Sequence, residues 1–276
     1  MLFYLKINTL GYNNAMLIKY NYHTHTTRCG HAYGSDEEYI LAAIKQGVKE
    51  LGFSDHCPFP NVYQEGIRMD YEQLDEYISS INKLKEKYID QIKIYVGLEA
   101  EYYHEIDDYY HKLLEKIDYL ICGQHFALSE DRQVYVGFGR DDEKLAEGYT
   151  KRVIEAMESG LFKYIAHPDI ILRSYRVEGP FRESIVRRIC EAAERTHTPL
   201  ELNMEGMRKK VEHNNVWTDD YYPLPYFWNI ASEYNIDVII GGDYHNPEDM
   251  FLDYDKYGFD FVNKFHLHLI DKVNIE

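Results

Sequence analysis

Histidine and carboxylate residues recur in this chain directly after short apolar segments. His23 and His25 form a His-x-His pair after residues 18–22, and Asp243 and His245 repeat that spacing after residues 238–240. The same placement is shared by four further residues: His56, Glu99, His125 and His167. Imidazole and carboxylate groups are ligands for Zn, Mn and Fe. The pattern therefore predicts a centre that binds divalent metal ions.

Composition supports metal ions as partners and argues against several others. Lys and Arg number 30 against 47 Asp and Glu, which gives a net charge of -17. Such a field repels nucleic acid and anionic membranes and favours bound cations. No window approaches the ~18 apolar residues that a membrane helix needs, and the first residues lack a secretory pattern, so we expect a cytoplasmic protein.

Cysteine usage excludes two kinds of site. The chain has four cysteines, they lie far apart, and no C-x-x-C pair occurs. Neither a disulfide framework nor a closed thiolate zinc site is therefore expected. A histidine and carboxylate site would instead leave coordination positions open for water.

Seven apolar segments alternate with stretches of helical period, which predicts an α/β fold. The expected strands are residues 18–22, 51–54, 92–98, 119–122, 164–166, 200–202 and 238–240. The expected helices are residues 36–50, 71–88, 105–117, 142–158, 180–195 and 223–234. Strict alternation implies a parallel sheet, and seven repeats within 276 residues favour closure into one barrel over two domains.

Local signals set the expected ends of these elements. Ser35 and Glu38 form a capping box that opens the first helix, and Gly52 is the expected stop. Pro180 and Pro223 suit the first turns of their helices. We expect residues 1–15, which precede the first strand, to be a dispensable N-terminal extension and residues 16–276 to form a single barrel domain. The long segment 126–141 carries Arg132 and Arg140 and suits a lid over a site.

The barrel geometry brings the ligand candidates together. The carboxyl ends of parallel strands meet on one face of a barrel, which is where a site forms. Alternate residues of an extended strand share a face, so His23 and His25 can chelate one ion. Spacing alone leaves His31 undecided, and Glu101 rivals Glu99 for the carboxylate role because it points the same way.

At these residues the chain resembles the PHP (polymerase and histidinol phosphatase) superfamily. The motifs, in order, are His-Thr-His at 23–25 followed by His31, Ser-Asp-His at 54–56, Gly-Leu-Glu at 97–99, Gly-Gln-His at 123–125, Ala-His-Pro-Asp at 166–169 and Gly-Asp-Tyr-His at 242–245. The likeness covers residues 18–250. Glu-Leu-Asn-x-x-Gly-x-Arg at 201–208 is most similar to the histidinol-phosphate phosphatases. This resemblance implies a distorted (β/α)7 barrel.

The resemblance also implies three divalent metal ions, which could be Zn, Mn or Fe. His23, His25, Glu99 and Asp243 would hold one ion, and Glu99 would bridge to a second ion held by His125 and His167. His31, His56 and His245 would hold the third. Asp243, His245 and Glu99 are the expected catalytic residues. One departure is Met204-Glu205, where the family more usually has Thr-Ser, and it leaves the substrate in doubt.

The implied activity is phosphomonoester hydrolysis, with L-histidinol phosphate as the expected substrate. Bound metal ions generate hydroxide from water, so no side-chain nucleophile is needed. Arginine offers a bidentate fork to phosphate, and Arg28, Arg173 and Arg208 each follow a strand end. The general acid stays open, with Asp169 as one candidate.

Three alternatives remain at this point. Another PHP phosphoesterase would act on a nucleotide, a sugar phosphate or phosphotyrosine through the same site. An amidohydrolase also begins with His-x-His, but it would need a Lys that bridges two metal ions at the position where this chain has His125. A non-catalytic metal-binding PHP module is the third alternative. The expected partner is a small phosphate ester, and the oligomeric state stays open.

Overall fold

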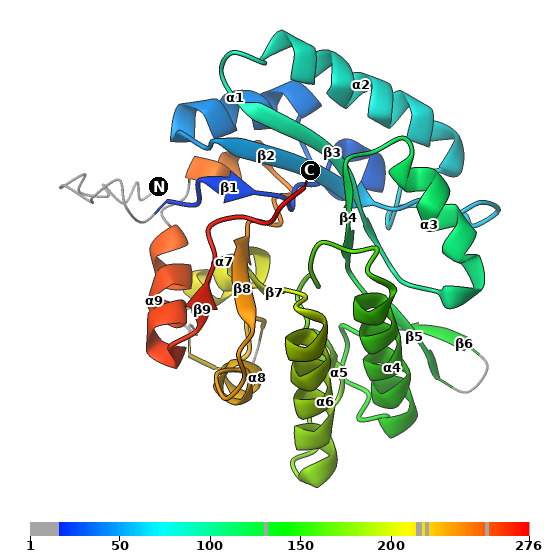
Figure 1. Cartoon of the computed structure of the whole chain (residues 1–276), viewed down its shortest axis with the longest axis vertical. Helices are drawn as coiled ribbons and strands as arrows, with labels where there is room; N and C mark the ends of the chain where they lie inside the picture. Colours follow the sequence, from blue (N-terminus) through cyan, green and yellow to red (C-terminus); the bar gives the residue numbers. More distant parts are fainter. Residues whose placement is uncertain (1–16, 130–131, 214–216, 219–220, 252–253, 276) are drawn as a thin grey trace, which may run out of the picture.

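The computed structural model describes residues 17–129, 132–213, 217–218, 221–251 and 254–275. The expected N-terminal extension, residues 1–15, lies outside them. The fold belongs to the predicted α/β class, with parallel strands that curve into a distorted, partly closed barrel (Figure 1).

The first half of the barrel is a continuous parallel sheet in chain order. It contains β1 (Tyr20–Asn21), β2 (Glu50–His56), β3 (Lys93–Ala100) and β4 (Tyr119–Cys122). The fifth predicted strand is reduced to Ile165, which bridges Cys122 on one side and Leu200 on the other. Through this residue β4 is followed by β7 (Leu200–Asn203) and β8 (Asp237–Gly241).

The barrel closes at its carboxyl end through a single bridge. Thr24, just beyond β1, pairs in parallel with Tyr244, just beyond β8. The backbone N–H of His25 donates to the carbonyl of Tyr244 at 2.9 Å. This contact joins the two segments that carry the His-x-His and Asp-x-His motifs. One strand that we did not predict, β9 (His268–Leu269), pairs with β8 on its other edge.

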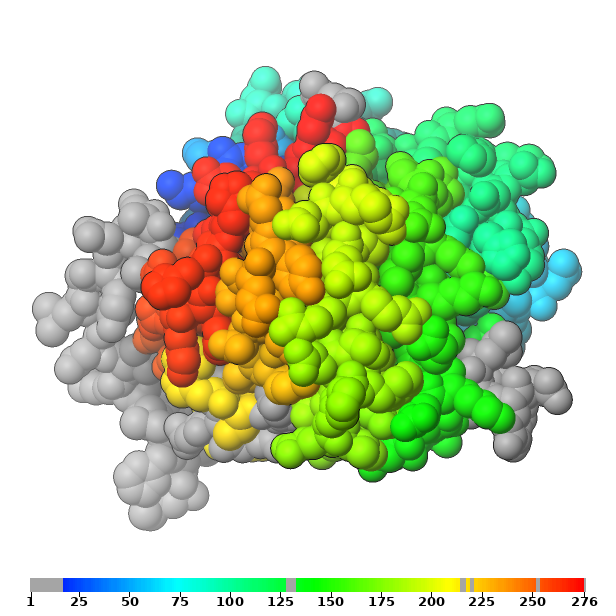
Figure 2. Space-filling model, turned by 60° about the horizontal axis from the view of Figure 1, so that its bottom comes forward, coloured from blue at the N-terminus to red at the C-terminus, as the bar shows by residue number. Residues whose placement is uncertain are grey.

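Helices cover the outside of the sheet. They are α1 (Asp36–Gln46), α2 (Leu74–Lys87), α3 (Asp107–Leu114), α4 (Glu143–Ser159), α5 (Ile171–Ser174), α6 (Pro180–Thr196), α7 (Met204–Glu212), α8 (Pro225–Ala231) and α9 (Asp255–Phe265). Short 3-10 turns are η1 (Thr27–Cys29), η2 (Tyr71–Gln73), η3 (His104–Ile106) and η4 (Pro247–Phe251). Figure 2 shows α6 in yellow-green beside α4 in green on one outer face. No helix among the described residues is long and apolar enough to span a membrane.

The first helix begins as predicted but ends earlier. Ser35 caps it, and the carboxylate of Glu38 accepts from the Ser35 backbone N–H at 2.6 Å. The helix stops at Gly47, whose φ of 77° is the left-handed conformation that glycine adopts without strain. The predicted stop, Gly52, lies within β2 instead. A side chain there would collide with Tyr119, which explains why glycine suits the position.

Two further segments differ in detail from what the sequence indicates. Helix α8 begins at Pro225, and Pro223 precedes it in a cis peptide with Tyr222. The expected lid is an antiparallel hairpin over much of its length, with β5 (Phe126–Ser129) paired to β6 (Arg132–Tyr135). The hairpin places Phe126 and Tyr135 beside the site described below.

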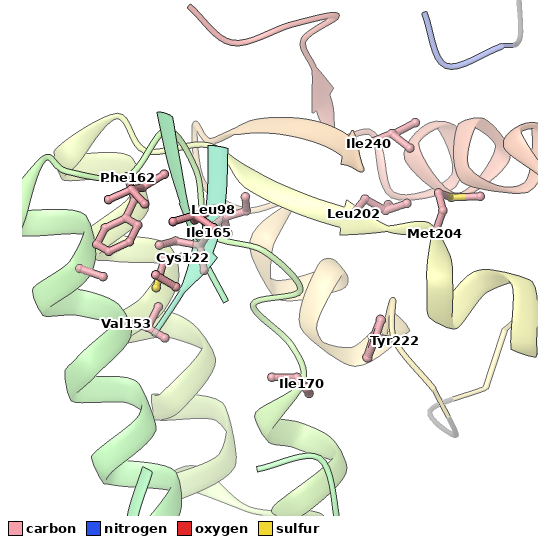
Figure 3. Packing of buried hydrophobic residues seen from close by; sticks show 14 of the residues in the cluster. Leu98, Cys122, Val153, Phe162, Ile165, Ile170, Leu202, Met204, Tyr222 and Ile240 are labelled. Atoms are coloured by element: carbon pink, nitrogen blue, oxygen red, sulfur yellow. The ribbon is translucent and has the colours of Figure 1, made fainter. Parts of the chain in front are cut away.

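Two apolar clusters hold the fold together. The larger lies between the sheet and its helices, where Val153 of α4 and Phe162 pack near Cys122 and Ile165 (Figure 3). The smaller fills the barrel, and its buried members are Tyr22, Tyr95, Tyr119, Ile121, Tyr164, Ala166, Ile239, Val273 and Ile275. Tyr119 donates from its hydroxyl to the carbonyl of Tyr22 at 2.8 Å. Buried tyrosines with satisfied hydroxyls therefore form the floor beneath the strand ends.

Candidate metal centre

The strand ends deliver the ligand candidates to one cavity of 540 Å³. Eight of the nine predicted metal ligands line it: His25, His31, His56, Glu99, His125, His167, Asp243 and His245. His23 is completely buried beneath them. The structure therefore brings together every residue of the predicted set, including His31, which spacing alone had left undecided.

Four of these residues form a compact first cluster. Nε2 of His23 lies 3.1 Å from Nε2 of His25 and 3.5 Å from Oδ1 of Asp243. Oε2 of Glu99 is 3.5 Å from each of the two imidazole Nε2 atoms. Ligands held ~2.1 Å from a tetrahedral ion are ~3.4 Å from one another, so these separations suit one shared ion.

Two buried oxygens support this fit. Among the described residues, Glu99 Oε2 and Asp243 Oδ1 make no hydrogen bond of regular geometry, although both are shielded from solvent and each has an imidazole nitrogen close by, at 3.0 Å from His56 and 3.1 Å from His25 respectively. An unpaired buried carboxylate oxygen is costly, and a divalent cation is the group that would satisfy it. Both oxygens face the His23 and His25 imidazoles.

The other oxygen of Glu99 faces a second cluster. Glu99 Oε1 is 2.8 Å from Nε2 of His167 and 3.5 Å from Nε2 of His125. The two oxygens of one carboxylate therefore point at two different sets of imidazoles. This arrangement is suited to a carboxylate that bridges two ions.

A third group of imidazoles lies at the open side. The ring centre of His31 is 4.9 Å from that of His245 and 5.2 Å from that of His56. Nδ1 of His56 lies 3.0 Å from Glu99 Oε2, which connects this group to the first cluster. The buried thiol of Cys29 lies within reach of His31 and His245, a neighbour that the cysteine spacing gave no reason to expect.

Two buried carboxylates that the sequence reasoning did not assign support the ligands from behind. Glu201 Oε1 is 2.7 Å from Nδ1 of His23, and Asp55 Oδ1 is 3.5 Å from Nδ1 of His25. Such carboxylates fix the tautomer and orientation of a metal-binding histidine. Glu201 is a charged residue within an otherwise apolar strand, and this feature of the sequence could have identified it as part of the site.

Glu101, the rival of Glu99, has a different environment. Arg68 grips its two oxygens at 2.9 and 3.0 Å. Burial alone would raise the pKa of Glu101, but Arg68 and His125 lower it to about 2. One oxygen also lies 3.2 Å from Nδ1 of His125. Glu101 thus contacts Nδ1 of His125 in the same way that Glu201 contacts Nδ1 of His23.

The charges of the centre are strongly coupled. Burial opposes the charged form of His23, yet Asp243, Glu201 and Glu99 raise its pKa well above the usual value. Burial likewise opposes the charged form of Asp243, whose pKa is held well below the usual range by His23 and His25. The buried carboxylates are therefore stable only with positive charge beside them, which protons on the imidazoles or bound metal ions can supply.

Of the three arginines considered for phosphate, one reaches the cavity. Arg173 lines it, lies over the rings of Tyr221 and Tyr222, and has a buried Nε without an acceptor among the described residues. Arg28 instead forms ion pairs with Asp36 and Glu76.

Arg208 supports the site from outside the cavity. It donates to the backbone carbonyls of Gly242 and Asp243, both at 2.8 Å. Asp169, the candidate general acid, is also absent from the described cavity wall. It accepts from the Leu224 backbone N–H at 2.6 Å and from the Trp228 indole at 3.2 Å, and burial raises its pKa to about 6.

The rest of the wall is mainly apolar. Its side chains come from the hairpin, from the segment after His167 and from two flanking loops: Ile67, Phe126, Tyr135, Phe138, Ile170 and Tyr222. Two charged residues of α7, Glu205 and Lys209, complete it. The cavity thus has the candidate metal centre at its base, Arg173 at its side and an apolar, aromatic wall that suits a flat ring of a ligand.

Comparisons with known proteins agree with this architecture. The PHP domain family model matches residues 21–205, more than half of the chain. The probable histidinol-phosphatase of Deinococcus radiodurans is 31% identical over 231 residues, covering 82% of this chain and 85% of that protein. The histidinol-phosphatase of Bacillus subtilis is 23% identical, covering 85% and 96%.

A solved structure shares the fold. Histidinol phosphate phosphatase from Lactococcus lactis subsp. lactis, solved in complex with Zn, L-histidinol and phosphate, superposes with a TM-score of 0.69 at 18% identity. The match covers 94% of this chain and 99% of that protein. The family match, the relative at 31% identity and the shared fold lead to one conclusion. This chain belongs to the PHP domain family.

Proposed function

We propose that this chain is a metal-dependent phosphomonoesterase that hydrolyses L-histidinol phosphate to histidinol and phosphate. The observation that carries the proposal is the convergence of Glu99 and Asp243, each with an unpartnered buried oxygen, on imidazoles at the base of a 540 Å³ cavity. Relatives named histidinol-phosphatase and the family membership support the same activity.

Nine residues would hold the metal ions in three sets. His23, His25, Glu99 and Asp243 form the first set, Glu99 with His125 and His167 the second, and His31, His56 and His245 the third. Zn, Mn and Fe suit these donors. Ions bound there would lower the pKa of a coordinated water to roughly 7 and offset the charge of the phosphoryl group.

In this proposal, buried carboxylates of the protein orient the histidines that would bind the metal ions. Glu201 accepts from Nδ1 of His23, which leaves the Nε2 lone pair of that imidazole directed into the site. Glu101, neutralised by Arg68, stands in the same relation to His125. Asp243, His245 and Glu99 are the residues closest to the reaction in this proposal.

Arg173 is the proposed phosphate anchor. Its buried Nε has no acceptor among the described residues, and the guanidinium lines the cavity. A planar fork of this kind binds a phosphoryl group through two parallel hydrogen bonds. The aromatic side chains of Phe126, Tyr135 and Phe138 would then receive the leaving alcohol, whose imidazole ring is flat.

A phosphate-release screen tests the function. Purified protein supplied with Zn, Mn or Fe should release phosphate from L-histidinol phosphate with a higher kcat/KM than from nucleotides, sugar phosphates or phosphotyrosine. His125→Ala should abolish release, whereas His104→Ala, at a half-exposed position outside the cavity wall, should not. Preference for another ester would reassign the substrate, and no release from any ester would overturn the phosphatase proposal.

A further inference from the structure

One acidic side chain of the described cavity wall is not explained by metal binding. The wall contains three carboxylates, and two of them, Glu99 and Asp243, belong to the candidate metal centre. The third is Glu205, whose side chain is 20% exposed. A carboxylate in a site for phosphate esters repels the phosphate, so its position calls for a cationic partner.

The backbone holds Glu205 firmly beside the metal centre. It lies in the first turn of α7, and its N–H donates to the side-chain oxygen of Asn203 at 2.9 Å. The amide group of Asn203 in turn donates to Oδ2 of Asp243 at 3.0 Å. The same Asn side chain therefore links the start of α7 to a candidate metal ligand.

Tyr222 connects the Glu205 side chain to the cavity interior. Its hydroxyl donates to Oε2 of Glu205 at 3.1 Å, and its ring centre is 5.6 Å from that of His167. The guanidinium of Arg173 lies 5.9 Å from the centre of the same ring. The cavity therefore has a cationic pole at Arg173 and an anionic pole at Glu205, both next to one buried tyrosine.

Tyr135 is influenced by both poles. Burial raises its pKa, Arg173 lowers it and Glu205 raises it further. Both charges thus act on the same part of the cavity, next to the wall that would receive the leaving group.

A cation of the protein already pairs with Glu205. Nζ of Lys209, one turn further along α7, contacts Oε1 of Glu205, and the Lys209 side chain is 46% exposed. An ion pair between residues at this exposure is weak, because water competes for both charges. A second ammonium group that arrives inside the cavity could therefore replace it.

We propose that Glu205 binds the ammonium group of the substrate, so that the site selects phosphate esters of amino alcohols over esters that lack the amine. The phosphoryl group lies toward Arg173 and the metal centre, and the amine lies toward Glu205, where it displaces Lys209. This inference rests on the proposed function and specifies its substrate class.

The first test compares two esters that differ by one amino group. The metal-loaded enzyme is assayed with L-histidinol phosphate and with its desamino analogue, 3-(imidazol-4-yl)propyl phosphate. Glu205→Gln should lower the ratio of kcat/KM for the amino ester over the desamino ester by about 10- to 100-fold, because a charge-assisted hydrogen bond is lost. Lys209→Met should raise this ratio, since it removes the competing cation. Glu212→Gln, an exposed position at the end of the same helix, is the matched control and should leave the ratio as in the wild type.

The second test measures binding without turnover. Calorimetry with the metal-loaded protein should show tighter binding of L-histidinol than of 3-(imidazol-4-yl)propanol, and Glu205→Gln should remove the difference. If the wild type hydrolyses both esters with equal kcat/KM, the inference is overturned while the phosphatase function stands. If it hydrolyses neither ester, the proposed function fails, and the binding experiment decides the inference: a preference that depends on Glu205 supports it, and no preference overturns it.

Discussion

Nδ1 of His23 lies 2.7 Å from an oxygen of Glu201, and both side chains are completely buried. The other oxygen of Glu201 accepts from the backbone N–H of His167 at 3.1 Å and from the amide of Asn203 at 2.8 Å. Asn203 also donates to Asp243. One carboxylate behind the cavity therefore positions three candidate metal ligands, which come from three different strand ends.

We expect Glu201→Gln to weaken metal binding by about 10- to 100-fold, the usual effect of losing a carboxylate behind a metal-binding histidine. The near-identical shape of Gln keeps the packing, so the fold should persist. Competition with a chromophoric chelator measures the change. Glu191→Gln, on the exposed face of α6, is the control. Equal affinity in both variants would show that Glu201 does not act on the ligands.

A second expectation concerns Gly123, which lies directly against the Glu99 side chain. A Cβ at this position would collide with Oε1 of Glu99, the oxygen that faces His167 and His125. Gly123→Ala should therefore displace the Glu99 carboxylate and lower both metal content and turnover by at least about tenfold, as expected for a misplaced ligand. At Gly139 the nearest atom to an added Cβ is the Arg173 carbonyl at 3.8 Å, so Gly139→Ala should leave metal content unchanged.

The strands and their ends were predictable because the information is local. Short apolar runs must be buried between layers, and the polar residues that follow them must lie at the barrel's carboxyl face. For β4 the predicted and observed bounds coincide, Tyr119–Cys122. Residue types compatible with metal binding, placed at those ends, then predicted which side chains converge.

Side-chain partners and element ends could not be predicted in the same way. Gly47 ends α1 rather than Gly52 because the chain must already be extended at Glu50 to pair with Lys93. Arg28 follows a strand end like Arg173, but its guanidinium is hydrogen-bonded to Asp36 of α1 and to Glu76 of α2. Where a helix ends and which partner a side chain has depend here on tertiary contacts that no local sequence pattern contains.

The arginines differ in the outcome expected from mutation. Arg173→Ala should lower kcat/KM by about 10- to 100-fold with unchanged metal content, because it removes a charge-assisted contact to phosphate. Arg208→Ala should instead lower metal content, since it releases the carbonyls of Gly242 and Asp243. Arg28→Ala should affect neither quantity by more than a few-fold. Normal metal content in Arg208→Ala with impaired turnover would move that residue to the substrate.

The last expectation concerns removal of the metal ions. Elemental analysis of the reconstituted protein should find two or three ions per chain, and chelation should abolish turnover. It should also lower Tm, because a ligand at 1,000 times its Kd stabilises the native state by about 4 kcal/mol, which corresponds to about 8–16 °C for a chain of this size.

Two variants and a control connect this shift to the centre. Asp243→Asn and His125→Ala each remove one ligand candidate from a different cluster, so each should reduce the Tm difference between metal-loaded and chelated protein. His104→Ala should retain the full difference because its side chain is 55% exposed and lies outside the cavity wall. If chelation left Tm unchanged in the wild type while metal was removed, the buried carboxylates of Glu99 and Asp243 would have to be satisfied by the protonated histidines alone, and the metal centre would contribute nothing to the fold.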